Sequence, residues 1–273
     1  MRPQARNDRL FLALLAAVVG LAWVSLWVWG RSPYARFLEH DALASVSPED
    51  AALLAFFLAG WTLMVFAMML PTSLPLITLF HRMVRDRAER LWLVFLLIGG
   101  YITVWAGFGA LVHLADLALH QGIYRAPVLD SGDRAIGAAI LVLAGVYQFT
   151  PLKRHCLDKC RSPLSFIAGH WHGTAASSET DPTRASRPER RLRAAFSVQA
   201  FRLGFDHGLY CLGCCWSLML LMFAVGSGSI GWMLALGAIM AVEKNLPWGR
   251  RLSSPLGVAL VAAGLLTALD VGL

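Results

Sequence analysis

The stretch LYCLGCCWSLMLLMFAV, from Leu209 to Val225, contains no charged residue and is apolar enough to predict a membrane-spanning helix. The same stretch carries three cysteines, Cys211, Cys214 and Cys215. At about 100° per residue, the three thiols fall on one stripe of a helix. The stretch therefore predicts a helical membrane protein that gathers sulfur donors on one face of a span.

The rest of the chain has the composition of a polytopic membrane protein. Of its 273 residues, 57% are hydrophobic and 15% are charged, whereas a soluble domain has about 25% charged residues. Seven apolar blocks predict seven spans: Leu10 to Trp29, Ala51 to Leu70, Leu91 to Leu119, Ala135 to Thr150, Leu209 to Val225, Ile230 to Val242 and Pro255 to Val271. The sixth block is short, and six spans remain without it. We expect an all-α transmembrane helix bundle of about seven spans, forming one transmembrane domain over residues 1–273.

Lysine and arginine are unevenly distributed between the segments that join these blocks. With a cytoplasmic N-terminus and seven spans, 20 of the 24 Lys and Arg residues lie inside and 4 lie outside, in agreement with the positive-inside rule. The net charge of +7 then reflects topology and attraction to the lipid bilayer. It does not indicate a nucleic-acid partner, because no basic stripe alternates with aromatic residues. Residues 164–195, rich in Ala, Ser, Thr, Pro and Arg, predict a mobile cytoplasmic linker.

Two further cysteines, Cys156 and Cys160, follow the fourth block at a spacing that points both the same way on a helix. The expected orientation places all five thiols near the cytoplasmic face, where a structural disulfide is disfavoured and metal binding or redox chemistry is expected. His207 shares the helical stripe of the later thiols, and Met219 lies at or near its edge. The alternative is that the cysteines pack as small apolar residues between helices.

The second block supplies thioether candidates. Met64 and Met68 share a helical face within WTLMVFAMMLPTSLP, residues 61–75. Methionine also fills gaps in apolar cores, which is the alternative interpretation. Thiolate with thioether favours Cu(I), thiolate with imidazole also suits Zn(II), and thiolates alone can hold an iron–sulfur cluster. We expect Cu(I), with zinc or an iron–sulfur cluster as the alternatives.

The sixth block ends in two charged residues. Glu243 lies near membrane depth, where an ionisable group is costly and indicates a function, such as a proton relay or a link to the cysteines. Lys244 follows it and is expected to extend to the cytoplasmic interface. Adjacent residues of a helix point in different directions, so the two are not expected to pair on one face.

Several motifs of the chain are shared with one bacterial family. They are W..M..AMMLP...P at Trp61 to Pro75, Y...W at Tyr101 and Trp105, YQFTPLK..CL..CR.P at Tyr147 to Pro163, HGLYCLGCCWSLM at His207 to Met219, and EKNLP at Glu243 to Pro247. On these motifs the chain resembles a family of predicted metal-binding integral membrane proteins, a domain of unknown function. The resemblance implies a multi-pass protein of the bacterial inner membrane that binds a metal, without a defined reaction.

Together these features predict a soft-metal site at the cytoplasmic side. The ligands would be the five cysteines, with His207 as a ligand or as a partner of one, and with Met64, Met68 and Met219 extending the site into the membrane. We expect a role in metal handling or transport rather than in catalysis. One alternative is a membrane thiol–disulfide oxidoreductase that uses the CxxC pair at the start of the fifth span, and another is a scaffold. The sequence leaves the protein partner open.

Overall fold

The computed structural model describes residues 3–32, 51–123, 132–171, 188–225 and 229–270. Within these ranges the chain forms helices and no β-strand, which confirms the all-α fold. The α-helices are α1 (Pro3–Gly30), α3 (Ala51–Met68), α4 (Leu74–Met83), α5 (Arg90–Ile123), α6 (Gly132–Tyr147), α7 (Pro151–Arg161), α8 (Pro163–His170), α9 (Pro188–Val225), α10 (Ile230–Asn245) and α11 (Ser253–Asp270). Two short 3-10 helices, η2 (Pro71–Ser73) and η4 (Gly249–Leu252), join some of them.

Four helices of the described residues are long and apolar enough to cross a membrane, or six spans result if two bent pairs each count as one. The pairs are α3 with α4, bent by 46°, and α6 with α7, bent by 66°. The expected further span, α10, has 16 residues, which is about 24 Å of helix against a hydrocarbon core of about 30 Å. The structure thus supports four to six spans. The cytoplasmic N-terminus stays a prediction, which reporter fusions to both termini would test.

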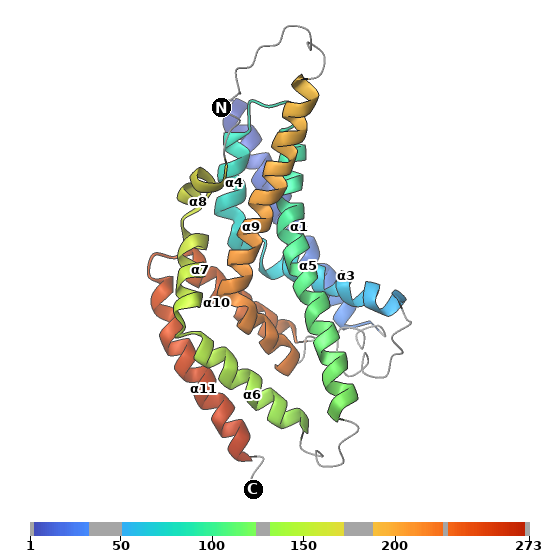
Figure 1. Ribbon diagram of the computed structural model, residues 1–273, viewed down its shortest axis with the longest axis vertical. Helices are drawn as coiled ribbons and strands as arrows, with labels where there is room; N and C mark the ends of the chain where they lie inside the picture. The colour runs from blue at the N-terminus through green and yellow to red at the C-terminus, as the bar shows by residue number, and fades with distance from the viewer. Residues whose placement is uncertain (1–2, 33–50, 124–131, 172–187, 226–228, 271–273) are drawn as a thin grey trace.

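Helices α5 and α9 form the long central pair of the bundle (Figure 1). Their backbones approach closely because glycine has no side chain: a Cβ on Gly204 would lie 2.7 Å from the carbonyl carbon of Leu97. A Cβ on Gly208 would lie 3.0 Å from the Cβ of Val104. The contacts advance along both helices in the same direction, so the pair is parallel. Close approach at small residues is a main source of helix association in membranes.

Helix α9 is much longer than the sequence indicates. The expected span began at Leu209, but the helix begins at Pro188, which places Cys211 about six turns from its N-terminus. The expectation that the cysteines lie in the first turns of a helix is therefore wrong. The reason is tertiary: Phe196 and Leu203, in the more polar first half of α9, are buried in a hydrophobic cluster, so packing continues the helix where hydropathy alone ends it.

The linker predicted over residues 164–195 is helical at both ends. Helix α8 covers its beginning and α9 covers its end from Pro188 onward. Residues 172–187 of this prediction lie outside the described residues.

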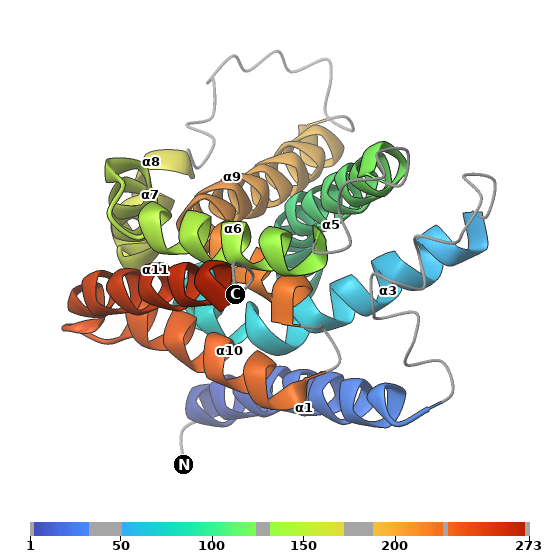
Figure 2. The same ribbon diagram turned by 90° about the horizontal axis from the view of Figure 1, so that it is seen from below.

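Three helix interruptions meet near the middle of α9. They are the η2 turn between α3 and α4, the turn between α6 and α7, and the end of α10 before η4. Seen along the long axis, α6, α7, α10 and α11 gather on one side of α9, and α5 lies on the other (Figure 2). Irregular backbone at membrane depth is tolerated where protein buries it. These interruptions therefore direct side chains toward an interior site that straight helices would not form.

Candidate metal centre

Helix α7 is held against the middle of α9. Its N-cap residue is Thr150, whose hydroxyl accepts a hydrogen bond from a first-turn amide at 3.2 Å. Pro151 begins the helix at a position where its missing N–H costs little. The contact point on α9 is Gly213, where a Cβ would lie 2.6 Å from the Sγ of Cys156. Helix α7 thus presents Cys156 and Cys160 to the cysteine face of α9.

Four sulfur atoms form a continuous line, which we call the sulfur chain: Cys160, Cys214, Cys215 and Met69. The Sγ atoms of Cys160 and Cys214 lie 4.0 Å apart, and those of Cys214 and Cys215 lie 3.9 Å apart. The Sγ of Cys215 lies 3.8 Å from the Sδ of Met69. The sulfur chain joins α7, α9 and the residue that follows α3, and only Cys160 among its cysteines is partly exposed.

The spacing in the sulfur chain suits an ion bound by pairs of sulfurs. Two sulfurs bonded to one ion at about 2.3 Å each, and separated by about 4 Å, subtend an angle of about 120° at the ion. Within the described ranges, no group of three or more His, Cys, Asp or Glu side chains is arranged to hold a metal ion. The centre therefore offers thiol pairs, to which Met69 adds a thioether.

The other two cysteines lie beside the sulfur chain. Cys156 packs against the backbone of α9, as described above. The Sγ of Cys211 lies 2.9 Å from the Tyr101 hydroxyl and 2.9 Å from the Nζ of Lys244. The carbonyl oxygen of Cys211 accepts hydrogen bonds from the two thiols of the sulfur chain on α9, at 3.1 and 2.8 Å. All five cysteines are thus brought together, but in different surroundings.

Lys244 does not reach the cytoplasmic interface, as the sequence analysis expected. It is 6% exposed, and its Nζ donates to Cys211 Sγ at 2.9 Å and to Cys215 Sγ at 3.5 Å. A third hydrogen bond goes to the hydroxyl of Thr72 at 3.2 Å. The reason for the error is that α10 ends inside the bundle, so its last turn lies at the depth of the sulfur chain. The only signal in the sequence was a lysine directly after a block too short to span.

Glu243 belongs to a second buried network. The Nζ of Lys153 lies 2.9 Å from both carboxylate oxygens of Glu243, and it also donates to the side-chain oxygen of Gln148. The hydroxyl of Ser253 donates to Glu243 at 2.6 Å, and Arg161 donates to its backbone carbonyl. These contacts tie α10 to α7 and to the start of α11. In the described part of the chain, no hydrogen bond links Glu243 to a cysteine, so its predicted link to the cysteine site stays a prediction.

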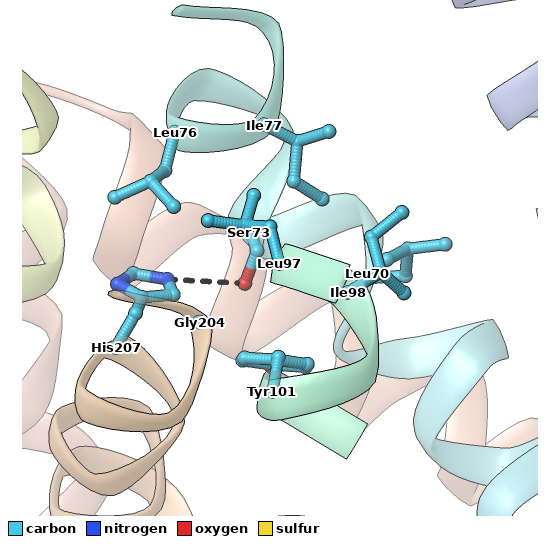
Figure 3. Close-up of a pocket in the computed structure, with 9 residues that line it drawn as sticks. All are labelled: Leu70, Ser73, Leu76, Ile77, Leu97, Ile98, Tyr101, Gly204 and His207. Carbon is cyan, nitrogen blue, oxygen red and sulfur yellow. Dashed lines mark hydrogen bonds between the residues drawn. The ribbon is translucent and has the colours of Figure 1, made fainter. Parts of the chain in front are cut away.

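His207 lies next to the centre, on the side of η2 and α4. Its Nε2 is 3.3 Å from the hydroxyl of Ser73, and its ring stacks on Tyr101 with centroids 5.8 Å apart. These residues line a cavity of about 10 Å³ (Figure 3), which is near the lower limit for one water molecule. The ring of His207 also contacts Phe166, and within the described residues its side-chain hydrogen bond goes to Ser73 and not to a sulfur atom. Its role as a ligand stays a prediction.

The methionines that the sequence analysis predicted as metal ligands are buried near the centre. The methionine that contacts a thiol is a different one. Met64, Met68 and Met219 are buried in the same cluster as the α9 cysteines. Met69 makes the contact in the sulfur chain. Helical periodicity put Met64 and Met68 on one face, yet α3 ends at Met68, and η2 follows with Pro71 as its first residue. The interruption changes the direction of Met69 in a way that periodicity does not describe.

Fold and site together define a class of protein: a helical bundle with helices of membrane-spanning length and a buried centre rich in sulfur. A family model, PpoB2, described as a copper chaperone, matches residues 58–267. The chain belongs to this copper chaperone family. No curated protein and no solved structure matches the chain. The matched range includes the whole sulfur chain, and the family links the protein to copper, the metal expected from its cysteines.

Proposed function

We propose that this protein binds Cu(I) within the membrane through the sulfur chain and takes part in copper handling. The observation that carries the proposal is the contact between thiols of α7 and α9, because Cys160 and Cys214 lie 4.0 Å apart although they are 54 positions apart in the sequence. Cys214 is the central ligand, since its Sγ neighbours Cys215 as well, at 3.9 Å. Membership of a copper chaperone family supports copper as the metal.

The donor set favours Cu(I) over the two alternatives. Structural zinc sites take four ligands, and iron–sulfur clusters are held by four cysteines. The sulfur chain has three thiols and one thioether, and mixed thiolate and thioether donors select Cu(I). Cu(I) also accepts two or three sulfur ligands, which matches the thiol pairs of the centre.

Copper enters and leaves this centre through Cys160. Its thiol is partly exposed, whereas the other four cysteines are buried. A donor or acceptor thiolate can therefore replace Cys160 first, while Cys214 and Cys215 keep the ion during the exchange. The buried Met64, Met68 and Met219 continue the soft donors in the same cluster, so they would extend the site if the ion moves across the membrane.

Metal binding by matched cysteine variants tests the proposal. The full chain, purified in detergent without oxygen, is titrated with Cu(I) against a competing chelator. We expect about one Cu(I) per chain, lost when Cys160 and Cys214 are both changed to Ser. The matched control is Cys156→Ser, which removes a thiol of α7 outside the sulfur chain and should keep the binding. Absence of bound metal in the wild type, with all five thiols freely alkylated, would contradict the proposal.

The oxidoreductase alternative has less support than the sequence indicated. It relied on a lowered thiol pKa at a helix N-terminus, but Cys211 and Cys214 lie in the interior of α9. The contact between Cys160 and Cys214 is the observation that still favours it. The same preparation distinguishes the two functions. In an oxidoreductase, the thiols of Cys160 and Cys214 would exchange with an added small-molecule disulfide, which is reduced to two thiols as the Cys160–Cys214 disulfide forms, and an added dithiol would reduce that disulfide again. The copper-binding protein would need both thiols reduced.

A further inference from the structure

Lys244 brings an ammonium group into direct contact with the sulfur centre. Its hydrogen bonds go to Cys211 Sγ at 2.9 Å and Cys215 Sγ at 3.5 Å. The third goes to Thr72, a neutral hydroxyl, at 3.2 Å. Among the residues that the structure describes, no carboxylate forms an ion pair with Lys244. A buried cation without a fixed counter-charge is costly at membrane depth and indicates a function.

The carboxylates on the surrounding helices form ion pairs with residues other than Lys244. Glu243, the preceding residue of α10, points toward α7 and pairs with Lys153 at 2.9 Å. Asp158, on α7, pairs with Arg250 at 3.1 Å. Neither carboxylate is available to Lys244. The charge that balances it has to come from the thiolates or from the complex that they form with a metal ion.

The charge of such a complex depends on the ion. Two thiols that bind one soft ion release two protons and contribute two negative charges. With a monovalent ion, Cu(I) or Ag(I), the dithiolate complex has a net charge of −1. With Hg(II), which also binds two thiolates, the complex is neutral. An adjacent ammonium stabilises the anionic complex much more than the neutral one, and the difference is large where the effective dielectric constant is low.

We infer that Lys244 makes the centre selective for monovalent over divalent soft metal ions, by supplying the positive charge that balances an anionic dithiolate complex. The inference rests on the proposed function, because it takes thiols of the sulfur chain as the metal ligands. Lys244 is a positioning residue and not a ligand, since its ammonium has no lone pair. Its place is kept by Arg161, which donates to the carbonyl oxygens of Glu243 and, at 3.0 Å, of Pro247.

A comparison of two metal ions in two variants tests this selectivity. The affinities of the detergent-purified full chain for Ag(I), a redox-inert monovalent ion, and for Hg(II) are measured anaerobically at one pH in competition with dithiothreitol. Lys244→Gln keeps a hydrogen-bond donor, on a side chain one bond shorter, but removes the charge. It should lower the ratio of Ag(I) to Hg(II) affinity on the order of 100-fold. Lys244→Arg keeps the charge and should leave the ratio nearly unchanged.

The ratio separates the effect of charge from damage to the fold. A misfolded centre would lose both ions together, whereas the inference expects Hg(II) binding to persist in Lys244→Gln. An unchanged ratio in a Lys244→Gln variant that still binds Hg(II) overturns the inference and leaves the proposed function intact. A wild type that binds neither ion overturns the proposed function as well. If Lys244→Gln does not fold, the wild type alone tests the inference. Its ratio of Ag(I) to Hg(II) affinity should exceed the same ratio for free dithiothreitol. A ratio at or below that of dithiothreitol overturns the inference.

Discussion

Two buried lysines, Lys153 on α7 and Lys244 on α10, lie near the place where these helices meet, and their charges are balanced in different ways. Lys153 is 0% exposed and pairs with Glu243, so the protein supplies its counter-charge. Lys244 is 6% exposed and contacts Cys211 and Cys215 instead. The comparison shows that the charge of Lys153, paired with Glu243, holds α7 and α10 together at all times. The charge of Lys244, by contrast, is balanced only when the neighbouring thiols are ionised or bind a metal.

The largest expected effect comes from removing the counter-charge of Lys153. Glu243→Gln leaves the ammonium of Lys153 buried and unpaired, which should lower the free energy of unfolding by about 3–5 kcal/mol. Unfolding in detergent, followed by the loss of helical signal as denaturant is added, measures the change. In this variant the difference between Lys153 and Lys244 disappears, because both lysines lack a carboxylate partner.

An exposed ion pair of the same region provides the control. Arg250 and Asp158 lie 3.1 Å apart, with side chains 54% and 47% exposed. Arg250→Gln should therefore change the stability by less than about 1 kcal/mol. Equal losses in Glu243→Gln and Arg250→Gln would show that the buried pair does not hold the junction together.

An intermediate effect is expected where α7 meets α9. In Gly213→Ala the new methyl group would lie 2.6 Å from Cys156 Sγ, so α7 has to move away from α9. Overpacking of this kind costs about 1–3 kcal/mol. Separation of Cys160 from Cys214 should also weaken Cu(I) binding, which chelator competition measures alongside stability. The variant shows whether the ion-pair region and the sulfur region depend on each other through α7.

The matched control is a glycine-to-alanine change at a position where the new methyl group meets no neighbouring atom. A Cβ on Gly107, in α5, would meet no atom within 4 Å. Gly107→Ala should leave the binding of Cu(I) unchanged and raise stability slightly, because alanine favours a helix over glycine by about 1 kcal/mol. If Gly213→Ala bound Cu(I) as well as Gly107→Ala did, the placement of α7 would not determine the site.

The smallest effect should be confined to the sulfur region. Met69→Leu removes the thioether 3.8 Å from Cys215 and preserves apolar volume, so stability should change by less than about 1.5 kcal/mol. The affinity for Cu(I) should fall a few-fold, since a weak third ligand is lost while the thiols remain. Met64→Leu is the control, as Met64 is buried in the same cluster without being a member of the sulfur chain. Equal affinities in the two variants would exclude Met69 as a ligand.

Features that depend on nearby residues could be predicted from the sequence. The apolar blocks are local, and each of them lies largely within a helix of the structure. The cysteine stripe of α9 is local too, because residues three and four apart share a helical face. The start of α9 and the direction of Met69 could not be predicted in this way. The start of α9 depends on packing of Phe196 and Leu203 in a hydrophobic cluster with other helices, and the direction of Met69 depends on the break between α3 and η2.

The sequence by itself determined that this protein is helical, that its helices are long and apolar, and that sulfur donors are abundant in it, because these properties follow from composition and periodicity. Only the tertiary structure decided which sulfurs meet and which charge lies beside them. Cys160 meets Cys214 because α7 turns back against Gly213, and Lys244 reaches the thiols because α10 ends inside the bundle. Hydropathy places a segment in the membrane, but the contacts between segments set the depth and direction of each side chain.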